Sequence, residues 1–509
     1  MSAGMSDDTG RLKFLKGRWI DNWDPENEEQ WEREGSKIAR RNLGFSVYAE
    51  FLGFVVWALW AITVPQLNKY GFSFSDSEQF TLISTPALVG ATLRFPYTYM
   101  VAKIGGRNWT IVSATLLLIP TAAMAWAISN NPTLPAGCAD WGQNGCAAGA
   151  EGGTSFAMMV FVAALAGFGG GNFASSMSNI TFFFPQKTKG WALGLNAAGG
   201  NIGSAVAQFS VPILVSVTAG SAAIGAAVYL PIAGWFWIPF ILLAVGGAFW
   251  GMNNLTSAKN DMSGVVAALK DKHLWVMSFL YIGTFGSFIG LGAAFPKLLN
   301  DQFVDNASFT LTFGTTAAVV GLSFLGPLVG SLARPYGGKL ADRFGGAIIT
   351  VVAFVVMIVA VFVAIQILEA KAGFWPFLLC FMVLFTATGA GNGSMYKMIP
   401  TVYHYKAGAS DGLAQSSGVS TERKIAATLG IVSAFGAYGG WLVPEIFKKA
   451  ISQTKHMDPS AADPTVMVNT NLVGGYQRGM WWLFAAYIVF LIVTIAVYVI
   501  PYSRRGTRV

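Results

Sequence analysis

The chain has few charged residues for its length, and few residues of the kinds that make catalytic or metal centres. Charged side chains make up 11% of its 509 residues, whereas soluble proteins have about a quarter. This deficit excludes a soluble globular protein. The sequence has only three cysteines and three histidines, and no pair of cysteines has the CxxC spacing of a metal site. We therefore expect neither an enzyme nor a cofactor.

Apolar residues are correspondingly abundant, at 54% of the chain. Apolar segments of about 20 residues, the length that crosses a bilayer as a helix, recur throughout the sequence. The sequence thus predicts an all-α integral membrane protein with twelve transmembrane helices. The expected spans are 45–66, 78–102, 109–129, 155–184, 190–216, 229–252, 273–296, 309–338, 347–369, 374–400, 422–446 and 479–501.

Lysine and arginine gather in alternate loops, which sets the expected orientation. The positive-inside rule places both termini in the cytoplasm, although the basic loop before the last span is an exception. The net charge of +8 is attributed to the lysine and arginine residues of these loops and not to a surface that binds nucleic acid. Cys138 and Cys146 then lie outside, where a disulfide and two reduced thiols are equally compatible with the sequence.

The chain is expected to divide into two bundles of six helices. A polar arm opens it and includes an amphipathic helix near 26–41, and Ser75 with Glu78 forms a capping box at the second span. The expected parts are a cytoplasmic arm (1–43), an N-terminal bundle (44–253), a cytoplasmic linker (254–272), a C-terminal bundle (273–502) and a cytoplasmic tail (503–509).

Two arginines, Arg94 and Arg334, stand almost alone in long apolar runs. An arginine at depth in a bilayer costs about 2.5–3.5 kcal/mol on insertion scales, so it needs a partner. The spans contain very few carboxylates, which favours an anion that passes through the protein. The alternative is that each arginine is structural and bonded to backbone carbonyl groups or to an acid in a loop.

A glycine-rich basic turn recurs six helices apart. KIGGR (Lys103–Arg107) follows the second span, and GGKLADRFGG (Gly337–Gly346) follows the eighth. The deep arginines precede these turns in corresponding spans. Two such halves with a substrate site between them are the layout of the major facilitator superfamily.

Polar and aromatic residues in the spans add donors and flat surfaces to this expected site. Asn172, Ser175, Ser176 and Asn179 fall on one face of the fourth span. They face either a substrate or a tightly packed helix, with the serines bonded to the preceding turn. Tyr281 and Phe285 are neighbours on the seventh span, where aromatic pairs also serve in packing.

Several segments resemble the NarK-type nitrate/nitrite porter family of the major facilitator superfamily. GFGGGNFASSMSNITFFFP and GAGNGSMYKMIP are similar to its two signatures, and the likeness covers nearly the whole chain. The resemblance implies transport of nitrate and nitrite by alternating access, in a bacterial-type inner membrane and by a functional monomer. It implies that Arg94 and Arg334 clamp the anion and that Asn179 and Tyr281 donate hydrogen bonds to it. Phe54 and Phe285 would line the site or stack on the anion. Asn172 and Asn392, one in each signature, would belong to the site as well.

The mode of coupling stays open at this stage. Exchange of nitrate for nitrite needs no titratable group, whereas nitrate/proton symport does. Glu50, one turn before Phe54, is the clearest candidate for proton coupling. The alternative, an ion pair with a basic loop residue near the membrane face, is slightly favoured. A facilitator for another small anion and a membrane nitrate sensor are the rival functions. The loops 130–153 and 402–421 have no functional interpretation.

Overall fold

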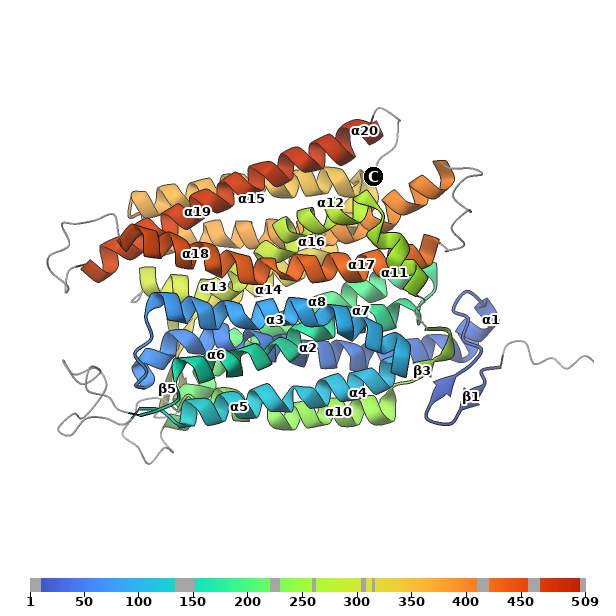
Figure 1. The fold of residues 1–509 in the computed structure, drawn as a ribbon, viewed down its shortest axis with the longest axis horizontal. Coiled ribbons are helices and arrows are strands. Elements are labelled where there is room, and N and C mark those ends of the chain that lie inside the picture. The colour runs from blue at the N-terminus through green and yellow to red at the C-terminus, as the bar shows by residue number, and fades with distance from the viewer. Residues whose placement is uncertain are drawn as a thin grey trace, which may run out of the picture.

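The computed structural model describes residues 11–132, 152–219, 229–258, 262–303, 308–313, 316–409, 421–455 and 467–503. Cys138 and Cys146 lie outside these ranges. Most of the described chain forms long helices that run along the longest axis of the molecule (Figure 1). Ten helical segments of the described chain are long and apolar enough to cross a membrane.

The first six expected spans are all helical. They correspond to α2 (Ser36–Leu67), α3 (Asp76–Ile104), α4 (Gly106–Leu116) with α5 (Leu118–Ser129), α6 (Phe156–Leu165) with α7 (Gly167–Thr181), α8 (Gln186–Ala219), and α9 (Ile232–Trp235) with α10 (Ile238–Gly251). The expected capping box is present, because Ser75 and Glu78 bond to each other's backbone at the start of α3. In the linker, α11 covers Met262–Leu269.

The last six spans follow the linker. They are α12 (Lys272–Tyr281) continued by the π-helical η5 (Ile282–Gly286) and α13 (Ser287–Gln302), then α14 (Leu325–Phe344), α15 (Gly346–Glu369), α16 (Phe374–Ala409), α17 (Thr421–Ala437) with α18 (Gly439–Lys455), and α19 (Met467–Thr494) with η8 (Ile495–Val499) and α20 (Ile500–Ser503). The two spans outside the ten apolar segments are α3 and α14, which carry Arg94 and Arg334.

The expected helix near 26–41 is present as α1 (Glu28–Gln30), η1 (Trp31–Gly35) and the first turns of α2, and it leads directly into the first span. Two other expectations about local structure are wrong. The expected span 309–338 begins with a hairpin of β4 (Ser308–Phe313) and β5 (Thr316–Gly321), where β-branched and aromatic residues favour strands. The expected loop 402–421 begins later, since α16 continues to Ala409 and Lys406 on its last turns binds Asp271.

The internal repeat is visible in the backbone. Gly105 between α3 and α4 has φ 93° and ψ 149°, and Gly345 between α14 and α15 has φ 94° and ψ 139°. Positive φ values of this kind are accessible to glycine and strained for other residues. The same turn therefore follows each arginine-bearing helix.

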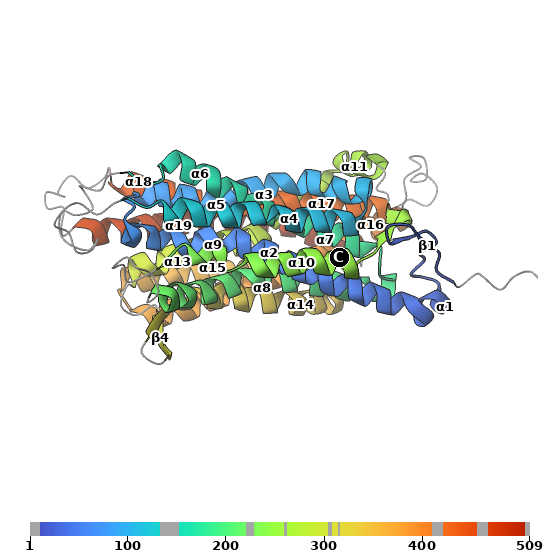
Figure 2. The same ribbon diagram turned by 90° about the horizontal axis from the view of Figure 1, so that it is seen from below.

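The helices α2 to α10 occupy the lower half of Figure 1, and α12 to α19 the upper half. The N-terminal residues from Arg11 and the C-terminal α20 lie at the same end, which we call the arm end. The opposite end, the far end, carries the β4–β5 hairpin (Figure 2). The arm is held by a small sheet in which β1 (Phe14–Leu15) pairs with β2 (Trp19–Ile20), and β2 pairs with β3 (Asn254–Leu255) of the linker.

Candidate functional site

The structure brings the two deep arginines to one pair of aromatic rings. Arg94 is 0% exposed and Arg334 is 3% exposed. The Cζ atom of Arg94 lies 4.6 Å from the ring centroid of Phe173 and 5.1 Å from that of Phe285. For Arg334 these distances are 5.4 and 5.9 Å. Because both guanidinium groups are measured from the same Phe173 centroid, their Cζ atoms are at most about 10 Å apart.

Each guanidinium group has an unused donor. Arg94 Nε donates to the Gly170 carbonyl oxygen (3.0 Å) and Nη1 to the Ser433 carbonyl oxygen (2.7 Å), so the structural interpretation holds for part of this side chain. Arg334 Nη2 donates to the Tyr281 hydroxyl at 3.4 Å. Arg94 Nη2 and Arg334 Nη1 have no hydrogen-bond partner in the described structure. A buried donor without a partner costs about 1–3 kcal/mol, and more when it is charged, so an anion between these groups would be strongly favoured.

Neither arginine forms an ion pair with a carboxylate of the described residues. Instead, the aromatic faces compensate part of the charge, because a cation within about 6 Å of a ring centroid is attracted by the ring quadrupole. The Phe173 and Phe285 rings stack with centroids 5.6 Å apart and an interplanar angle of 26°. Phe54 packs edge-on against Phe173 at 6.0 Å. Of the expected aromatic residues, Phe285 is thus at the arginine pair, and Phe54 lies behind it, against Phe173.

Phe173 itself was not among the expected site residues. It follows Asn172 in the glycine-rich signature, and this position was the available signal. Tyr396 was missed as well: its ring centroid lies 5.1 Å from Arg334 Cζ, and it belongs to the second signature. Tyr281 connects these groups, because its hydroxyl donates to Asn392 Oδ1 and accepts from Arg334. Asn392 therefore positions Tyr281, and its own Nδ2 is buried without a partner.

The glycines of the signatures let the helices approach closely at this level. A Cβ on Gly170 would lie 2.9 Å from the Gly90 Cα of α3, and one on Gly393 would overlap the Arg334 carbonyl oxygen of α14. Such close approach is typical of small residues in membrane helices. Both arginine-bearing helices thus pack backbone to backbone against a signature helix.

The polar face of α7 divides between three environments. Asn172 lies against Gly53 of α2, and its Oδ1 has no partner. Ser175 Oγ bonds to the Asn172 carbonyl oxygen (3.0 Å), as in the packing interpretation. Asn179 lies nine residues after Gly170, about 13 Å along the helix axis, where it packs against Gly106. The structure therefore does not bring Asn179 to the arginine pair, and its contact with a substrate stays a prediction.

Glu50 is 0% exposed and lies deep in the bundle. Its Oε2 accepts hydrogen bonds from Ser176 Oγ and from Asn196 Nδ2, the latter at 2.6 Å. The expected ion pair with a basic loop residue is wrong, because neutral donors hold this carboxylate. Both deep arginines attract it electrostatically. Two guanidinium groups and one carboxylate therefore leave this region with one excess positive charge when Glu50 is ionised.

Asn201 on α8 is a further residue that the sequence reasoning missed. It is 1% exposed, and neither polar atom of its amide has a partner. Asn201 shares a helix face with Gln208, seven residues later, whose Nε2 donates to the Gly292 carbonyl oxygen (2.8 Å). Phe285 lies seven residues before Gly292, and both helices run from the arm end to the far end. Asn201 thus lies at about the level of Phe285 along the helix axis, with both polar atoms of its amide unpartnered.

A cavity of about 530 Å³ at the arm end has Arg94 among its lining residues. It lies between α3, α7 and α17, and the arm residues Trp23 and Glu26 line its mouth together with Lys189 and Arg423. Trp23 Nε1 donates to the Phe182 carbonyl oxygen (3.0 Å), and Glu26 accepts from the Gln186 N–H (2.7 Å). The arm is thereby fixed beside the mouth.

Towards the far end, contacts join the lower and upper helices of Figure 1. Ser84 of α3 donates to Glu445 of α18 (2.8 Å), and Lys297 of α13 lies 3.0 Å from Asp76 of α3. Phe80 packs against Phe447 with ring centroids 6.5 Å apart. The two sets of helices are thus joined at the far end, and the arm-end cavity has Arg94 but not Arg334 in its lining.

This arrangement, with two sets of helices around one buried site, agrees with a comparison to known families. The Major Facilitator Superfamily matches residues 47–444. The chain belongs to this superfamily. It is therefore a multi-pass membrane transporter and not an enzyme, and the expected fold of helices in two halves is confirmed.

Relatives within the superfamily confirm the resemblance to NarK-type porters. The chain is 38% identical over 454 residues to "Nitrate/nitrite transporter NarU" of Salmonella typhimurium, which covers 86% of this chain and 90% of the relative. It is 30% identical over 408 residues to "Probable nitrate/nitrite antiporter NarK2" of Thermus thermophilus, with 77% and 84% covered.

Solved structures show the same fold at low identity. A D-xylose-proton symporter superposes with a TM-score of 0.58 at 15% identity and covers 90% of this chain and 97% of its own. The xylose transporter XylE from E. coli gives 0.57 at 13% identity, with 91% and 98% covered.

Proposed function

We propose that the protein carries nitrate and nitrite across a bacterial inner membrane by alternating access, with the anion held between Arg94 and Arg334. The observation that carries this proposal is the pair of unused guanidinium donors, both buried and both beside the rings of Phe173 and Phe285. A guanidinium fork matches adjacent oxygens of a planar oxyanion, which explains arginine in place of lysine. The names of the relatives supply the identity of the anion.

In this proposal the arm end faces the cytoplasm, in agreement with the positive-inside rule. The far end, where Ser84 bonds to Glu445 and Lys297 pairs with Asp76, then faces the outside of the cell. Transport requires that the halves, residues 44–253 and 273–502, rock about the arginine pair. Arg94 already bonds to Gly170 in one half and to Ser433 in the other, so an anion that replaces the Ser433 contact would change the connection between the halves.

Two coupling modes follow from the charges of the site. In nitrate/nitrite antiport, the mutual repulsion of Arg94 and Arg334 opposes reorientation of an empty carrier, so an anion is bound at every crossing. In nitrate/proton symport, protonation of Glu50 raises the excess charge from one to two and strengthens anion binding. Linkage then makes anion binding favour protonation by the same factor. The full burial of Glu50 beside neutral donors is the observation that favours a proton-coupled cycle.

Uptake of labelled nitrate into proteoliposomes tests the function and separates the two modes. Internal nitrite is either present or absent, and a pH gradient, acid outside, is either imposed or omitted. Antiport predicts uptake that depends on internal nitrite, whereas symport predicts uptake driven by the gradient alone. Competition by nitrite but not by formate or phosphate is expected. No uptake under any of the four conditions, or equal competition by formate, would overturn the proposal in favour of a sensor or another anion.

A further inference from the structure

A second basic cavity lies at the arm end, apart from the one that Arg94 lines. It has a volume of about 580 Å³ and is lined by residues of β1, the following turn, η1 and α2. Four of its lining residues are cationic, namely Arg18, Arg33, Lys37 and Arg41, and one, Glu34, is acidic. The cavity thus has an excess of three positive charges, and it belongs to neither the arginine pair nor the cavity that Arg94 lines.

Hydrogen bonds fix two of the four cations in place. Arg18 adopts a positive φ of 62°, which is uncommon for a residue other than glycine, and its Nη1 donates to the Trp250 carbonyl oxygen. Its own carbonyl oxygen accepts from the Asn254 N–H (3.0 Å) of the linker. Arg41 Nη2 donates to Asn253 Oδ1 (2.7 Å). These contacts hold two positive charges at the cavity wall at the expense of an unusual turn.

Among the described residues, the other two cations have no carboxylate partner. Within the described residues, Arg33 and Lys37 form no ion pair, although Glu34 lies between them in the sequence. They are four residues apart, so they project from the same side of the helix that leads into the first span. Like charges at this spacing repel each other. An anion in the cavity would remove that repulsion and accept hydrogen bonds from both side chains.

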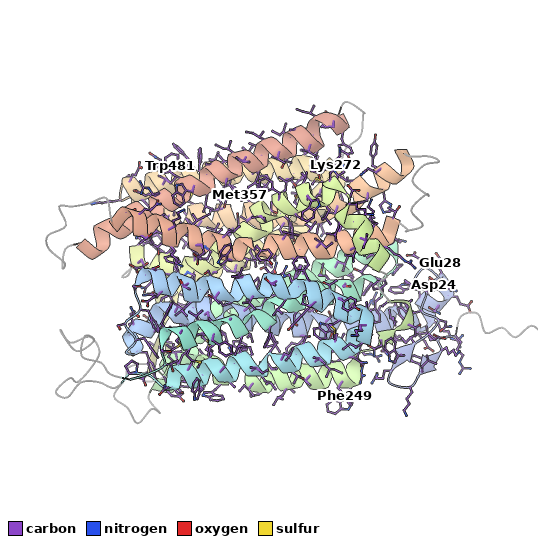
Figure 3. The ribbon with its side chains drawn as sticks, in the orientation of Figure 1. Asp24, Glu28, Phe249, Lys272, Met357 and Trp481 are labelled. Carbon is purple, nitrogen blue, oxygen red and sulfur yellow. The ribbon has the colours of Figure 1, made fainter. Side chains whose placement is uncertain are left out.

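The surroundings place the cavity at the level of the lipid headgroups. Phe249 and Trp250 end the apolar helix α10 and are 51% and 72% exposed, and Phe249 points away from the bundle in Figure 3. Exposed aromatic residues at the end of a membrane helix are typical of the interface belt. Since Arg18 bonds to the Trp250 carbonyl group, the cavity lies directly beside this belt.

An apolar pair completes the cavity. Phe14 and Leu15 of β1 line it and are 53% and 41% exposed. A free anion would gain nothing from these side chains, whereas an amphiphile can place its polar group among the cations and its apolar part on the phenylalanine and leucine. Clusters of basic residues next to a membrane helix are typical of sites for acidic lipids.

We propose that this cavity binds the headgroup of an acidic phospholipid from the leaflet at the arm end. The phosphate oxygens accept hydrogen bonds from Arg33 and Lys37, with Arg18 and Arg41 as fixed charges behind them. The acyl chains run along α10 beside Phe249 and Trp250. Because the arm is paired with the linker through β2 and β3, a bound lipid also ties the arm and the linker to the membrane surface. Inorganic phosphate shares the chemistry of the headgroup, and the apolar pair is what distinguishes the lipid.

Native mass spectrometry of the delipidated full-length protein tests this site. Phosphatidylglycerol is titrated against phosphatidylcholine for the parent protein and for three variants. R33Q/K37Q removes two cavity charges. R40Q/K103Q removes two exposed charges at the same end that do not line the cavity. F14S/L15S removes the apolar pair. Each variant is first checked for a monodisperse elution profile and an unchanged melting temperature.

The parent protein is expected to retain phosphatidylglycerol in preference to phosphatidylcholine. R33Q/K37Q should weaken the phosphatidylglycerol complex by roughly thirtyfold, since each basic residue near an anionic surface contributes about 1 kcal/mol, or a factor of about five. R40Q/K103Q should leave it unchanged, and F14S/L15S should weaken it as well. Equal loss in R33Q/K37Q and R40Q/K103Q, or no preference for the acidic lipid, would overturn the proposal. Displacement of the lipid by equimolar inorganic phosphate would overturn the assignment of the occupant.

Discussion

Lys297 of α13 and Asp76 of α3 form an ion pair of 3.0 Å that joins helices of different halves at the far end. The Lys297 side chain is 2% exposed and that of Asp76 is 21% exposed. Lys297 also lies 2.9 Å from Asp301, one turn later on its own helix, and Asp301 accepts from the Tyr476 hydroxyl (2.7 Å). Of these contacts, only the pair with Asp76 has to break when the far end opens.

The substitution Asp76→Ala is therefore expected to favour the state that is open at the far end. It removes one ion pair between the halves and leaves Lys297 paired with Asp301, so the buried lysine keeps a partner. Spin labels at Ser77→Cys and Lys449→Cys, in a background without the native cysteines, report the opening as a longer distance by electron–electron double resonance. Glu369→Ala is the matched control, since Glu369 is exposed and its hydrogen bond from Gln366 lies within α15. An unchanged distance distribution in Asp76→Ala would contradict the role of this pair.

Replacement of either deep arginine by lysine should abolish most transport. Lysine keeps the charge but loses the second parallel hydrogen bond to the anion, and it loses stacking on Phe173 and Phe285. We expect nitrate/nitrite exchange in proteoliposomes to fall by about a hundredfold or more, the effect of roughly 3 kcal/mol. Arg343→Lys, on an exposed turn of α14, should transport normally. Exchange within twofold of the parent protein in both Arg94→Lys and Arg334→Lys would refute the clamp.

Glu50→Gln separates proton coupling from anion binding. Glutamine keeps the shape of the side chain and can still accept from Asn196 and Ser176, but it cannot exchange a proton. If Glu50 couples protons, the variant should lose uptake driven by a pH gradient and retain nitrate/nitrite exchange. The test compares both assays in one preparation. Gradient-driven uptake at the parental rate would exclude Glu50 as the coupling group.

Asp271 at the arm end gives a pH-dependent stability. Burial alone would raise its pKa, but hydrogen bonds from the His273 backbone, Lys424 and Lys406 outweigh it and lower the pKa from 3.8 to about 2. A carboxyl group with a lowered pKa stabilises the fold at pH values above its ordinary pKa of 3.8. This stabilisation is lost as the pH falls toward 2. The contribution is about 2 kcal/mol at neutral pH.

Asp271→Asn should therefore lower the melting temperature at pH 7, and the difference from the parent protein should shrink between pH 4 and pH 3. Fluorescence-monitored melting in detergent measures both. Asp21→Asn is the control, because the Asp21–Lys13 pair is exposed at the surface and contributes little. A difference that is the same at pH 7 and pH 3 would show that the charge of Asp271 is not its cause.

Much of the candidate site could be predicted from the sequence because membrane burial makes polar residues costly. Arg94, Arg334 and Glu50 stand out for that reason alone, and Phe54, Phe285 and Tyr281 follow from spacing and resemblance. Phe173 and Tyr396 could not be found in this way. Aromatic and amide residues are common in membrane helices, and only packing decides which of them face the arginine pair.

Asn179 and Glu50 show that the position of a residue along the bundle and its contact partners cannot be predicted from helical spacing alone. Helical spacing placed Asn179 on the same face as Asn172, but a shared face says nothing of the distance along the axis, and Asn179 ends up against Gly106. For Glu50 the sequence could not exclude a partner in a loop. The packing of α2 against α7 and α8 brings Ser176 and Asn196 to the carboxylate, and these contacts connect residues more than a hundred positions apart.

The sequence by itself determined the membrane class, the repeat of an arginine followed by a glycine turn, and the need for an anionic partner, because hydropathy, backbone restrictions and charge are properties of local segments. The tertiary structure decided that both guanidinium groups meet at Phe173 and Phe285, that one donor on each remains unused, and that neutral donors hold Glu50. These features depend on how helices far apart in the sequence pack together, and that packing is set by many weak contacts at once.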